Sequence, residues 1–319
     1  MIMLSVLESK TFHFHWSSEI YGLGECFRRT ARYPRILPLF FTSDHGVNIS
    51  GYLDPDIKTR KVKTRKHITW SEENLHTNVA KLKIEGTQHP WLYYLEDNKE
   101  KLKENRSGSI FYPLHRAPGF IFHGLDDSES IKYLHNLPDQ YQPVHVSIHM
   151  HDLGSEREKL FLSAGFKVVT LGETNDRKFH EKFFSLISGY RYAFSESWGS
   201  HIPFLIKCGI PTQIIPRRIS ILEASENKKV HSNEYEMELR QAEKIFSKSP
   251  TQITSDQIQY VDRVLGVKLR KRRLQLSVIA YGQLVKLGLP WMINLLIETV
   301  PRRIAKGKTR ETKNKKGII

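Results

Sequence analysis

Strand-like and helix-like segments alternate through the middle of the chain, and this order restricts the fold more than any other feature of the sequence. Runs rich in β-branched and aromatic residues predict strands at residues 109–114, 144–149, 167–171, 191–194 and 212–215. Segments with helical periodicity predict helices at residues 127–137, 155–164, 176–188 and 200–208. Repeated strand–helix–strand units at this spacing predict right-handed crossovers and a parallel sheet covered on both faces.

Residues at the ends of these segments agree with the alternation. Ser155 and Asp176 can cap helices because their side-chain oxygens accept from first-turn N–H groups. Gly165 and Gly209 follow two of the helices as left-handed stops. Residues 106–230 are therefore predicted to form a Rossmann-like lobe.

The flanking parts of the chain are predicted to form a smaller lobe and a helical extension. Residues 1–105 contain expected strands at 36–42, 68–70 and 91–95 and an expected helix at 72–83, which together indicate a reduced α/β lobe. The polar segment 97–106 serves as the boundary. Residues 231–319 predict helices at 234–246, 255–265, 273–287 and 290–300.

Composition excludes several classes of protein. The chain has 319 residues, of which 39% are apolar, so it can bury a core. Its two cysteines, Cys26 and Cys208, are too few for a disulfide scaffold or a four-thiolate zinc site and fit a reducing compartment. The N-terminus lacks the pattern of a secretory signal, and no run of about 18 apolar residues predicts a membrane span. These features predict a cytoplasmic protein.

Positive charge is concentrated at the C-terminus. From residue 266 onward there are fourteen Lys and Arg against two Glu, a net of +12 in a chain whose formal charge is +15. The rest of the chain is nearly neutral, which disfavours a general nucleic-acid-binding protein and favours an anionic surface met by the tail. Two arrangements of residues 274–300 remain open: helices lying on the inner face of the cytoplasmic membrane, or helices packed on the lobes.

Polar residues follow the ends of the predicted strands in the Rossmann-like lobe. Ligands bind at this edge of an open parallel sheet because helix N-termini converge there with unpaired N–H groups. The candidates at this edge are His115, Arg116, His149, His151, Gly172, Glu173, Thr174, Ser195, Ser197, Gly199 and Ser200. The segment 195–200 is the best phosphate candidate, because small residues allow close backbone approach and hydroxyls donate to phosphate oxygens. The alternative for this segment is an ordinary serine cap.

The segment from 108 to 216, and above all the run SESWGSHIPFLIKCGIPTQIIP, resembles the nucleotide-sugar-binding half of GT-B-fold glycosyltransferases, with bacterial capsule and lipopolysaccharide transferases the most similar. The resemblance implies two Rossmann-like lobes, the N-terminal one reduced, with the donor on the C-terminal lobe and the acceptor on the N-terminal lobe. It implies that Ser195, Ser197, Gly199 and Ser200 hold the donor phosphates. Gly172 and Glu173 would then lie near the nucleobase or ribose.

A base is needed to take the proton of the acceptor hydroxyl if the transfer inverts the sugar. In GT-B enzymes the base usually comes from the N-terminal lobe, and Asp44 and His45 follow an expected strand there, so they are the candidates. The alternative is that they form an Asx turn with a surface histidine. His115 could stabilise the leaving phosphate or fill a structural role. His149 and His151 have the spacing of a metal site but are expected to line the cleft instead. Asp54 and Asp56 have the spacing of a metal-binding D-x-D motif, but their sequence context favours a turn. No cofactor or metal is expected to be required.

These observations predict a glycosyltransferase of surface-polysaccharide synthesis, peripheral to the membrane. It would use a nucleotide-sugar donor and a saccharide or lipid-linked acceptor. A transferase of polyol phosphate from a CDP-activated donor is the alternative on the same fold. A basic nucleic-acid-associated protein is the alternative from another class.

Overall fold

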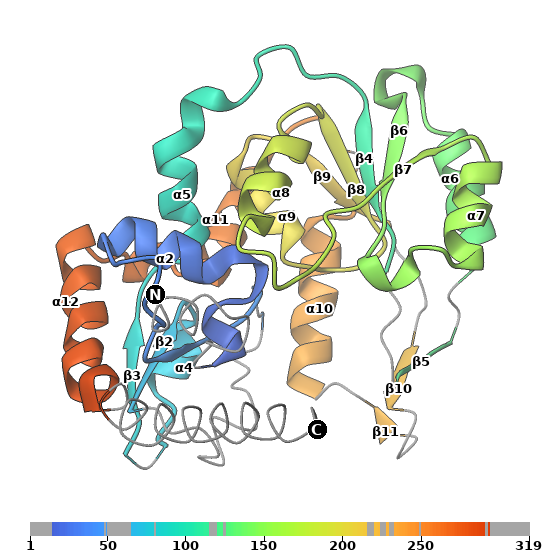
Figure 1. Cartoon of the computed structure of the whole chain (residues 1–319). Coiled ribbons are helices and arrows are strands. Elements are labelled where there is room, and N and C mark those ends of the chain that lie inside the picture. The colour runs from blue at the N-terminus through green and yellow to red at the C-terminus, as the bar shows by residue number, and fades with distance from the viewer. Residues whose placement is uncertain are drawn as a thin grey trace, which may run out of the picture.

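Two parallel β-sheets organise the chain (Figure 1), one in each half. The computed structural model describes residues 15–47, 49, 65–79, 81–114, 120–123, 126–215, 220–223, 228–229, 233–248, 250–290 and 293. Within these ranges the chain is an α/β protein whose two parallel sheets are both covered by helices, as the sequence predicts.

The larger sheet belongs to the second half and has the strand order β7-β6-β4-β8-β9, with every neighbouring pair parallel. Its strands are β4 (Ser109–Tyr112), β6 (Val144–Ser147), β7 (Lys167–Val169), β8 (Tyr192–Ser195) and β9 (Thr212–Ile214). All five strands predicted from the sequence are confirmed, each ending slightly earlier or shifted by one residue.

Helices cover both faces of this sheet. They are α6 (Asp127–His135), α7 (Glu156–Ser163), α8 (Phe179–Ile187) and α9 (His201–Lys207). Phe111 packs in one apolar cluster with residues of α6 and α7, while its neighbours Ile110 and Tyr112 pack in another with residues of α8 and α9. Because successive strand residues point to opposite faces, this division places α6 and α7 on one face and α8 and α9 on the other.

The connections reverse direction at one point in the sheet. The chain runs from β4 outward to β6 and β7 and then crosses back to β8 on the opposite side of β4. In open parallel sheets, such a reversal separates two neighbouring strands and leaves a crevice at their carboxyl ends. Here the crevice lies between the ends of β4 and β8, where Tyr112 pairs with Ser195.

The N-terminal half has a shorter parallel sheet, with the order β1-β2-β3. Its strands are β1 (Thr42–Ser43), β2 (Lys66–Thr69) and β3 (Lys83–Gly86), and its helices are α2 (Leu23–Ala31), α4 (Glu72–Leu75) and α5 (Pro90–Asn98). The predicted strand at 36–42 forms only at its end, and the predicted helix at 72–83 is a single turn that gives way to β3. The structure also has α2, which the sequence analysis did not identify.

The strand predicted at 91–95 is wrong, because these residues belong to α5. Pro90 stands in the first turn of this helix, where its missing N–H costs nothing. The ring of His89 accepts a hydrogen bond from the amide of Trp91 and caps the helix. Aromatic residues are buried on most sides of α5, which hides the helical periodicity.

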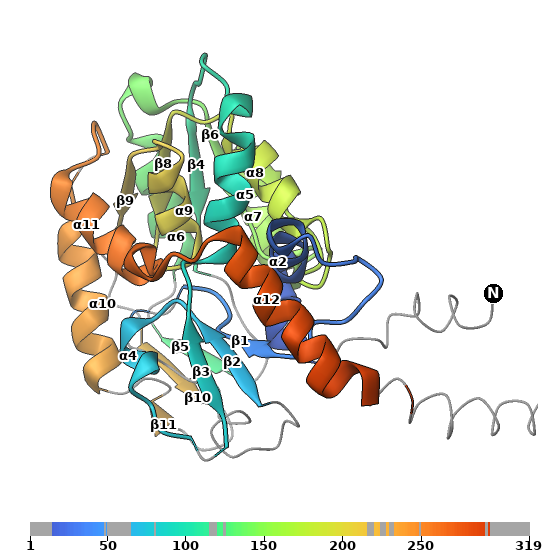
Figure 2. The same cartoon turned by 90° about the vertical axis from the view of Figure 1, so that its left-hand side faces the viewer.

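The last part of the chain is helical, as predicted. It contains α10 (Asn233–Ile245), α11 (Ser255–Val264), α12 (Arg273–Gln283) and the π-helical turn η7 (Leu284–Gly288). Thr254 and Gln257 form a capping box at the start of α11. Figure 2 shows α12 lying across α2, and Leu276, Ile279 and Ala280 pack there. The described part of 274–300 thus packs on the N-terminal half along one of its faces.

Short elements complete the described fold. These are η1 (Trp16–Ser18), η2 (Ile20–Gly22), η3 (Lys99–Lys101), η4 (Asp139–Tyr141), η5 (Met150–Asp152), η6 (Val267–Leu269), and a small antiparallel sheet of β5 (Phe120–His123), β10 (Ser220–Glu223) and β11 (Lys228–Lys229). Among the helices in the described ranges, none combines the length and apolar character that crossing a bilayer requires.

Candidate functional site

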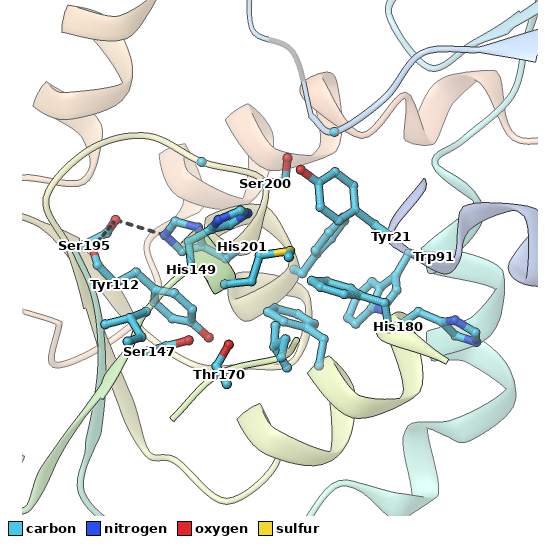
Figure 3. A pocket seen from close by; sticks show the side chains of 18 of the residues that line it. Tyr21, Trp91, Tyr112, Ser147, His149, Thr170, His180, Ser195, Ser200 and His201 are labelled. Atoms are coloured by element: carbon cyan, nitrogen blue, oxygen red, sulfur yellow. Dashed lines mark hydrogen bonds between the residues drawn. The ribbon is translucent and has the colours of Figure 1, made fainter. Parts of the chain in front are cut away.

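A cavity of about 340 Å³ lies at the carboxyl ends of β4, β6, β7 and β8, where the two halves meet (Figure 3). This volume falls within the range of small-molecule sites in proteins. The larger sheet contributes residues that follow each of these four strands. The N-terminal half contributes Tyr21, Leu23, Cys26, Gly46, His89 and Trp91. The crevice at the strand reversal is therefore closed by the N-terminal half of the molecule.

Three side chains meet at the strand reversal itself. His201, the first residue of α9, places Nε2 2.9 Å from the hydroxyl of Ser195. The imidazole stacks on the ring of Tyr112, with 4.2 Å between centroids. The Ser195 hydroxyl donates to the carbonyl of Ser197 at 2.7 Å, so its lone pairs face His201. With the Ser195 proton directed at the Ser197 carbonyl, a neutral His201 ring would donate from Nε2 to the Ser195 oxygen.

The ring of His149 is held by the loop that follows β6. Its Nδ1 accepts a hydrogen bond from the amide of His151 at 3.3 Å. In a neutral ring the proton would then be on Nε2. His149 lines the cavity, whereas His151 is exposed and lies outside the lining.

The segment predicted to bind phosphate does line the cavity. Ser195, Ser197, Trp198, Gly199 and Ser200 are all at its wall. The hydroxyl of Ser200 also accepts a hydrogen bond from the amide of Val47 at 2.8 Å, which ties this turn to the N-terminal half. A side chain at Gly199 would meet the His201 ring at 2.7 Å, so the close approach of turn and imidazole requires glycine here.

Hydroxyl groups gather at the ends of three neighbouring strands. Figure 3 shows Tyr112, Ser147 and Thr170 at one side of the cavity. They lie close together because β4 pairs with β6 and β6 pairs with β7, which brings the ends of the three strands side by side. Gly172 continues this wall with a φ of 76°. The predicted residues Glu173 and Thr174 lie outside the lining, although the Thr174 carbonyl accepts from the Tyr21 amide at 2.6 Å.

Another part of the lining is aromatic and neutral. Trp91, Phe179, Phe183 and Phe204 form it. Burial lowers the pKa of His89 to about 3, so this ring stays neutral at physiological pH. Burial also lowers the pKa of His180, which lines the cavity from α8.

Several polar atoms of lining residues are buried without a hydrogen-bond partner in the described part of the chain. They are the indole N–H of Trp91, the hydroxyl of Tyr112 and both ring nitrogens of His180. A buried polar group without a partner is costly, so such groups in native proteins are usually satisfied by solvent or ligand.

No described residue of the cavity lining is an Asp, Glu, Lys or Arg. Charge on a ligand would therefore be met by His149, hydroxyls and backbone amides. His115 and Arg116, the predicted partners at the end of β4, lie outside the described residues.

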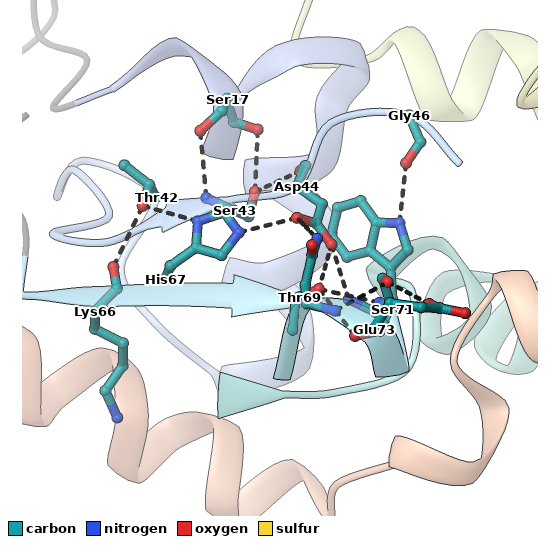
Figure 4. Close-up of polar contacts among 12 residues, drawn as sticks. Ser17, Thr42, Ser43, Asp44, Gly46, Lys66, His67, Thr69, Ser71 and Glu73 are labelled. Carbon is teal, nitrogen blue, oxygen red and sulfur yellow. Dashed lines mark hydrogen bonds and ion pairs between the residues drawn. The ribbon is translucent and has the colours of Figure 1, made fainter. Parts of the chain in front are cut away.

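Asp44 and His45 are not at this cavity. Asp44 is 5% exposed and accepts hydrogen bonds from four groups (Figure 4): His67 Nε2 at 2.9 Å, Thr69 Oγ1 at 2.5 Å, the Trp70 amide at 3.2 Å and Asn74 Nδ2 at 3.2 Å. His45 packs edge-on against Trp16, and only the next residue, Gly46, lines the cavity. The carboxylate that was expected as a base thus joins β1 to β2 and α4.

Replacing Asp44 by alanine is expected to lower the free energy of unfolding by about 2–3 kcal/mol, because four buried donors lose a charged acceptor. Urea denaturation measures the loss, and the partly exposed turn residue Asp176, changed to alanine as the control, should cost about 1 kcal/mol or less. A fully stable Asp44→Ala protein that has lost its catalytic activity would instead restore Asp44 as the base.

A buried ion cluster lies beneath the same edge of the sheet, and the sequence analysis did not identify it. Arg157 of α7 is 1% exposed at its side chain and binds Asp127 through Nε and Nη2 at 2.8 and 2.6 Å. Asp152 and Glu196 lie 3.5 and 3.6 Å from the guanidinium. Glu196 follows β8 and also accepts from the Leu114 amide after β4. The cluster fixes the loops that carry the cavity wall.

No group of three His, Cys, Asp or Glu residues within the described ranges is arranged to hold a metal ion. The rings of His149 and His151 lie 4.7 Å apart. Asp54 and Asp56 lie outside the described residues.

Comparison with known proteins gives structural likeness at a low TM-score and nothing at the level of sequence. No protein-family model matches the chain. No curated protein matches its sequence. Among solved structures, the chain is similar to UDP-GlcNAc 2-epimerase from Neisseria meningitidis, solved with UDP-GlcNAc bound, with a TM-score of 0.32 and 12% identity. The match covers 70% of this chain and 61% of the epimerase, less than two thirds of its length. A likeness at this level carries no argument about activity.

Proposed function

We propose that the chain is a nucleotide-sugar-dependent glycosyltransferase whose donor binds in the cavity between the two halves. The observation that carries the proposal is the position of this cavity: it lies at the reversal of strand order in a parallel sheet and is closed by a second parallel α/β unit. The acceptor is proposed to be a saccharide or lipid-linked saccharide of a surface polysaccharide. The proposal for the acceptor rests on the sequence resemblance alone.

The lining has the chemistry that a nucleotide sugar needs. The neutral aromatic wall around Trp91 and Phe204 suits a nucleobase or the apolar face of a sugar. The hydroxyls of Tyr112, Ser147 and Thr170 suit a polyhydroxyl group. The N–H of His149 and the turn at 195–200 suit the phosphates, whose charge would be stabilised by hydrogen bonds as it grows on the leaving group.

His201 is the proposed general base, in place of Asp44 and His45. Its imidazole would take the proton of the acceptor hydroxyl while that oxygen attacks the anomeric carbon. The bond from this carbon to the donor phosphate would break, and the electron pair would leave with the nucleotide. One displacement of this kind inverts the sugar. The Ser195 hydroxyl and the Tyr112 ring hold the imidazole in one orientation, which such a transfer requires.

A thermal-shift screen with UDP, GDP, CDP and CMP and their sugar derivatives tests the donor site. A nucleotide present at about 100 times its Kd should stabilise the protein by about 2.7 kcal/mol. Ser197→Ala should weaken that binding about tenfold or more, because one hydrogen bond to a charged phosphate is lost. The control is Ser163→Ala, an exposed serine at the end of α7. If no nucleotide raises the Tm, the proposed donor site is wrong.

A further inference from the structure

Large apolar side chains are exposed in a row along α12 and η7 and at two described positions that follow, 289 and 293. These residues, which we call the α12 face, are Leu274, Val278, Tyr281, Val285, Leu289 and Ile293, and they are 74, 66, 40, 61, 44 and 55% exposed. Their spacing of three or four residues places them on one side of the helical segment. The other side of α12 is also apolar and is buried against α2 through Leu276, Ile279 and Ala280. The helix is therefore apolar on two sides, and a helix that only faced water on its outer side would have polar residues there.

Nearly half of the exposed large apolar side chains in the described ranges belong to this one segment. Single exposed apolar residues are common on soluble proteins, but a row of six that extends over about five helical turns is not. The sequence of 263–297 contains no Asp or Glu. The charged residues of this segment are therefore all basic, whereas an ordinary solvated helix surface carries both signs of charge.

Cations surround the α12 face. Lys286 is exposed in η7, and Arg272 is exposed at the N-cap of α12. The Tyr281 hydroxyl donates to the Arg32 carbonyl at 2.9 Å, which places the exposed Arg32 at the edge of the row. Arg270 and Arg273 are already paired with Glu96 and Asp97. Among these described cations, the positive charge that is not paired with Glu96 or Asp97 thus lies beside the apolar row.

We propose that the α12 face docks on the surface of an anionic lipid bilayer, with the helical segment parallel to the membrane plane. A row of apolar side chains with cations at its edges and no acidic residue matches the boundary between acyl chains and anionic headgroups. A second copy of the chain fits less well, because a two-fold contact through this face would bring like charges together. The proposal goes beyond the proposed transferase activity and does not depend on it, because docking requires no nucleotide.

Co-sedimentation with vesicles tests the proposal on the full-length chain. The vesicles are phosphatidylcholine, with or without about 30 mol% phosphatidylglycerol, in about 0.1 and 0.5 M NaCl. The intact protein should bind the anionic vesicles and keep a salt-resistant fraction. Val278→Asp combined with Val285→Asp should lower partitioning at least about tenfold, because it places charge in the bilayer interface. Both valines are more than 60% exposed, so the variant should fold, which its Tm checks.

The matched control is Leu160→Asp combined with Leu162→Asp on α7, two leucines that are 43 and 51% exposed on another surface. This variant should bind vesicles as the intact protein does, and both variants keep the basic tail. Equal binding by the Val278/Val285 variant would overturn the proposal, as would an intact protein that ignores anionic vesicles. A concentration-dependent dimer in light scattering that the same variant abolishes would assign the face to a second copy and also overturn it.

Discussion

Changing His201 to glutamine is expected to lower the turnover of the proposed transferase by about 10²–10⁴-fold, the usual contribution of a general base. Glutamine can still reach Ser195, but it offers no nitrogen that accepts a proton near neutral pH. The Ser195 contact and the Tyr112 stacking orient the imidazole and do not supply the proton acceptor. The loss should therefore appear in kcat, while donor binding stays close to that of the intact enzyme.

The measurement is release of free nucleotide from whichever sugar donor the thermal-shift screen identifies. Donor affinity is measured alongside it, which separates loss of the base from loss of the site. His135→Gln on α6, whose ring packs against Phe166 away from the cavity, is the matched control and should leave turnover within about twofold of the intact enzyme. A His201→Gln enzyme with near-normal kcat would rule out the histidine as base.

The larger sheet could be predicted from the sequence because the local preferences of its segments agree with the elements that they form in the fold. Each strand is a run of β-branched and aromatic residues, and each crossover helix has recognisable ends such as Ser155 and Gly165. The N-terminal half lacks this agreement. Its strands are two to four residues long, and α5 has aromatic residues on several faces. Burial against the rest of the protein determines those elements, and it leaves no helical or strand periodicity in the local sequence.

Six of the residues predicted from the rule that ligands bind at the carboxyl edge of a parallel sheet lie at the cavity wall. They are His149, Gly172, Ser195, Ser197, Gly199 and Ser200. His201 was missed, although it directly follows that turn and its position at the start of α9 was a usable signal. Tyr112 and the wall formed by Trp91 depend on packing across the two halves, which one sequence does not reveal.

Asp44 shows why a polar residue after a strand is weak evidence for catalysis. The carboxyl end of β1 does face the joined halves, but the Asp44 side chain turns toward β2, where His67 and Thr69 supply donors. The decisive quantity is side-chain direction, which depends on the pairing of two strands 23 residues apart in the chain. His149, by contrast, lies on the loop after a central strand, and loops at this edge of such a sheet converge on the crevice.

Arg157 is expected to be the most important single charge for stability among the described residues near the cavity. Asp127, Asp152 and Glu196 are each at most 5% exposed at their side chains, and all three lie within 3.6 Å of its guanidinium. Removing one partner of a buried ion pair costs much more than an exposed pair contributes, because the remaining charges stay desolvated without compensation. Glu196 also connects β4 and β8, so this cost falls on the loops at the strand reversal.

Arg157→Met, which keeps most of the side-chain volume, should therefore lower the free energy of unfolding by about 3–5 kcal/mol in urea denaturation at neutral pH. Lys159→Met is the control two residues along α7, where Lys159 and Glu156 are 64 and 89% exposed, and it should change stability by about 0.5 kcal/mol or less. Because the Leu114 carbonyl also loses a donor in Arg157→Met, the cavity wall after β4 should loosen and donor binding should weaken in the folded fraction. A loss below about 1 kcal/mol would mean that the three carboxylates are compensated without Arg157.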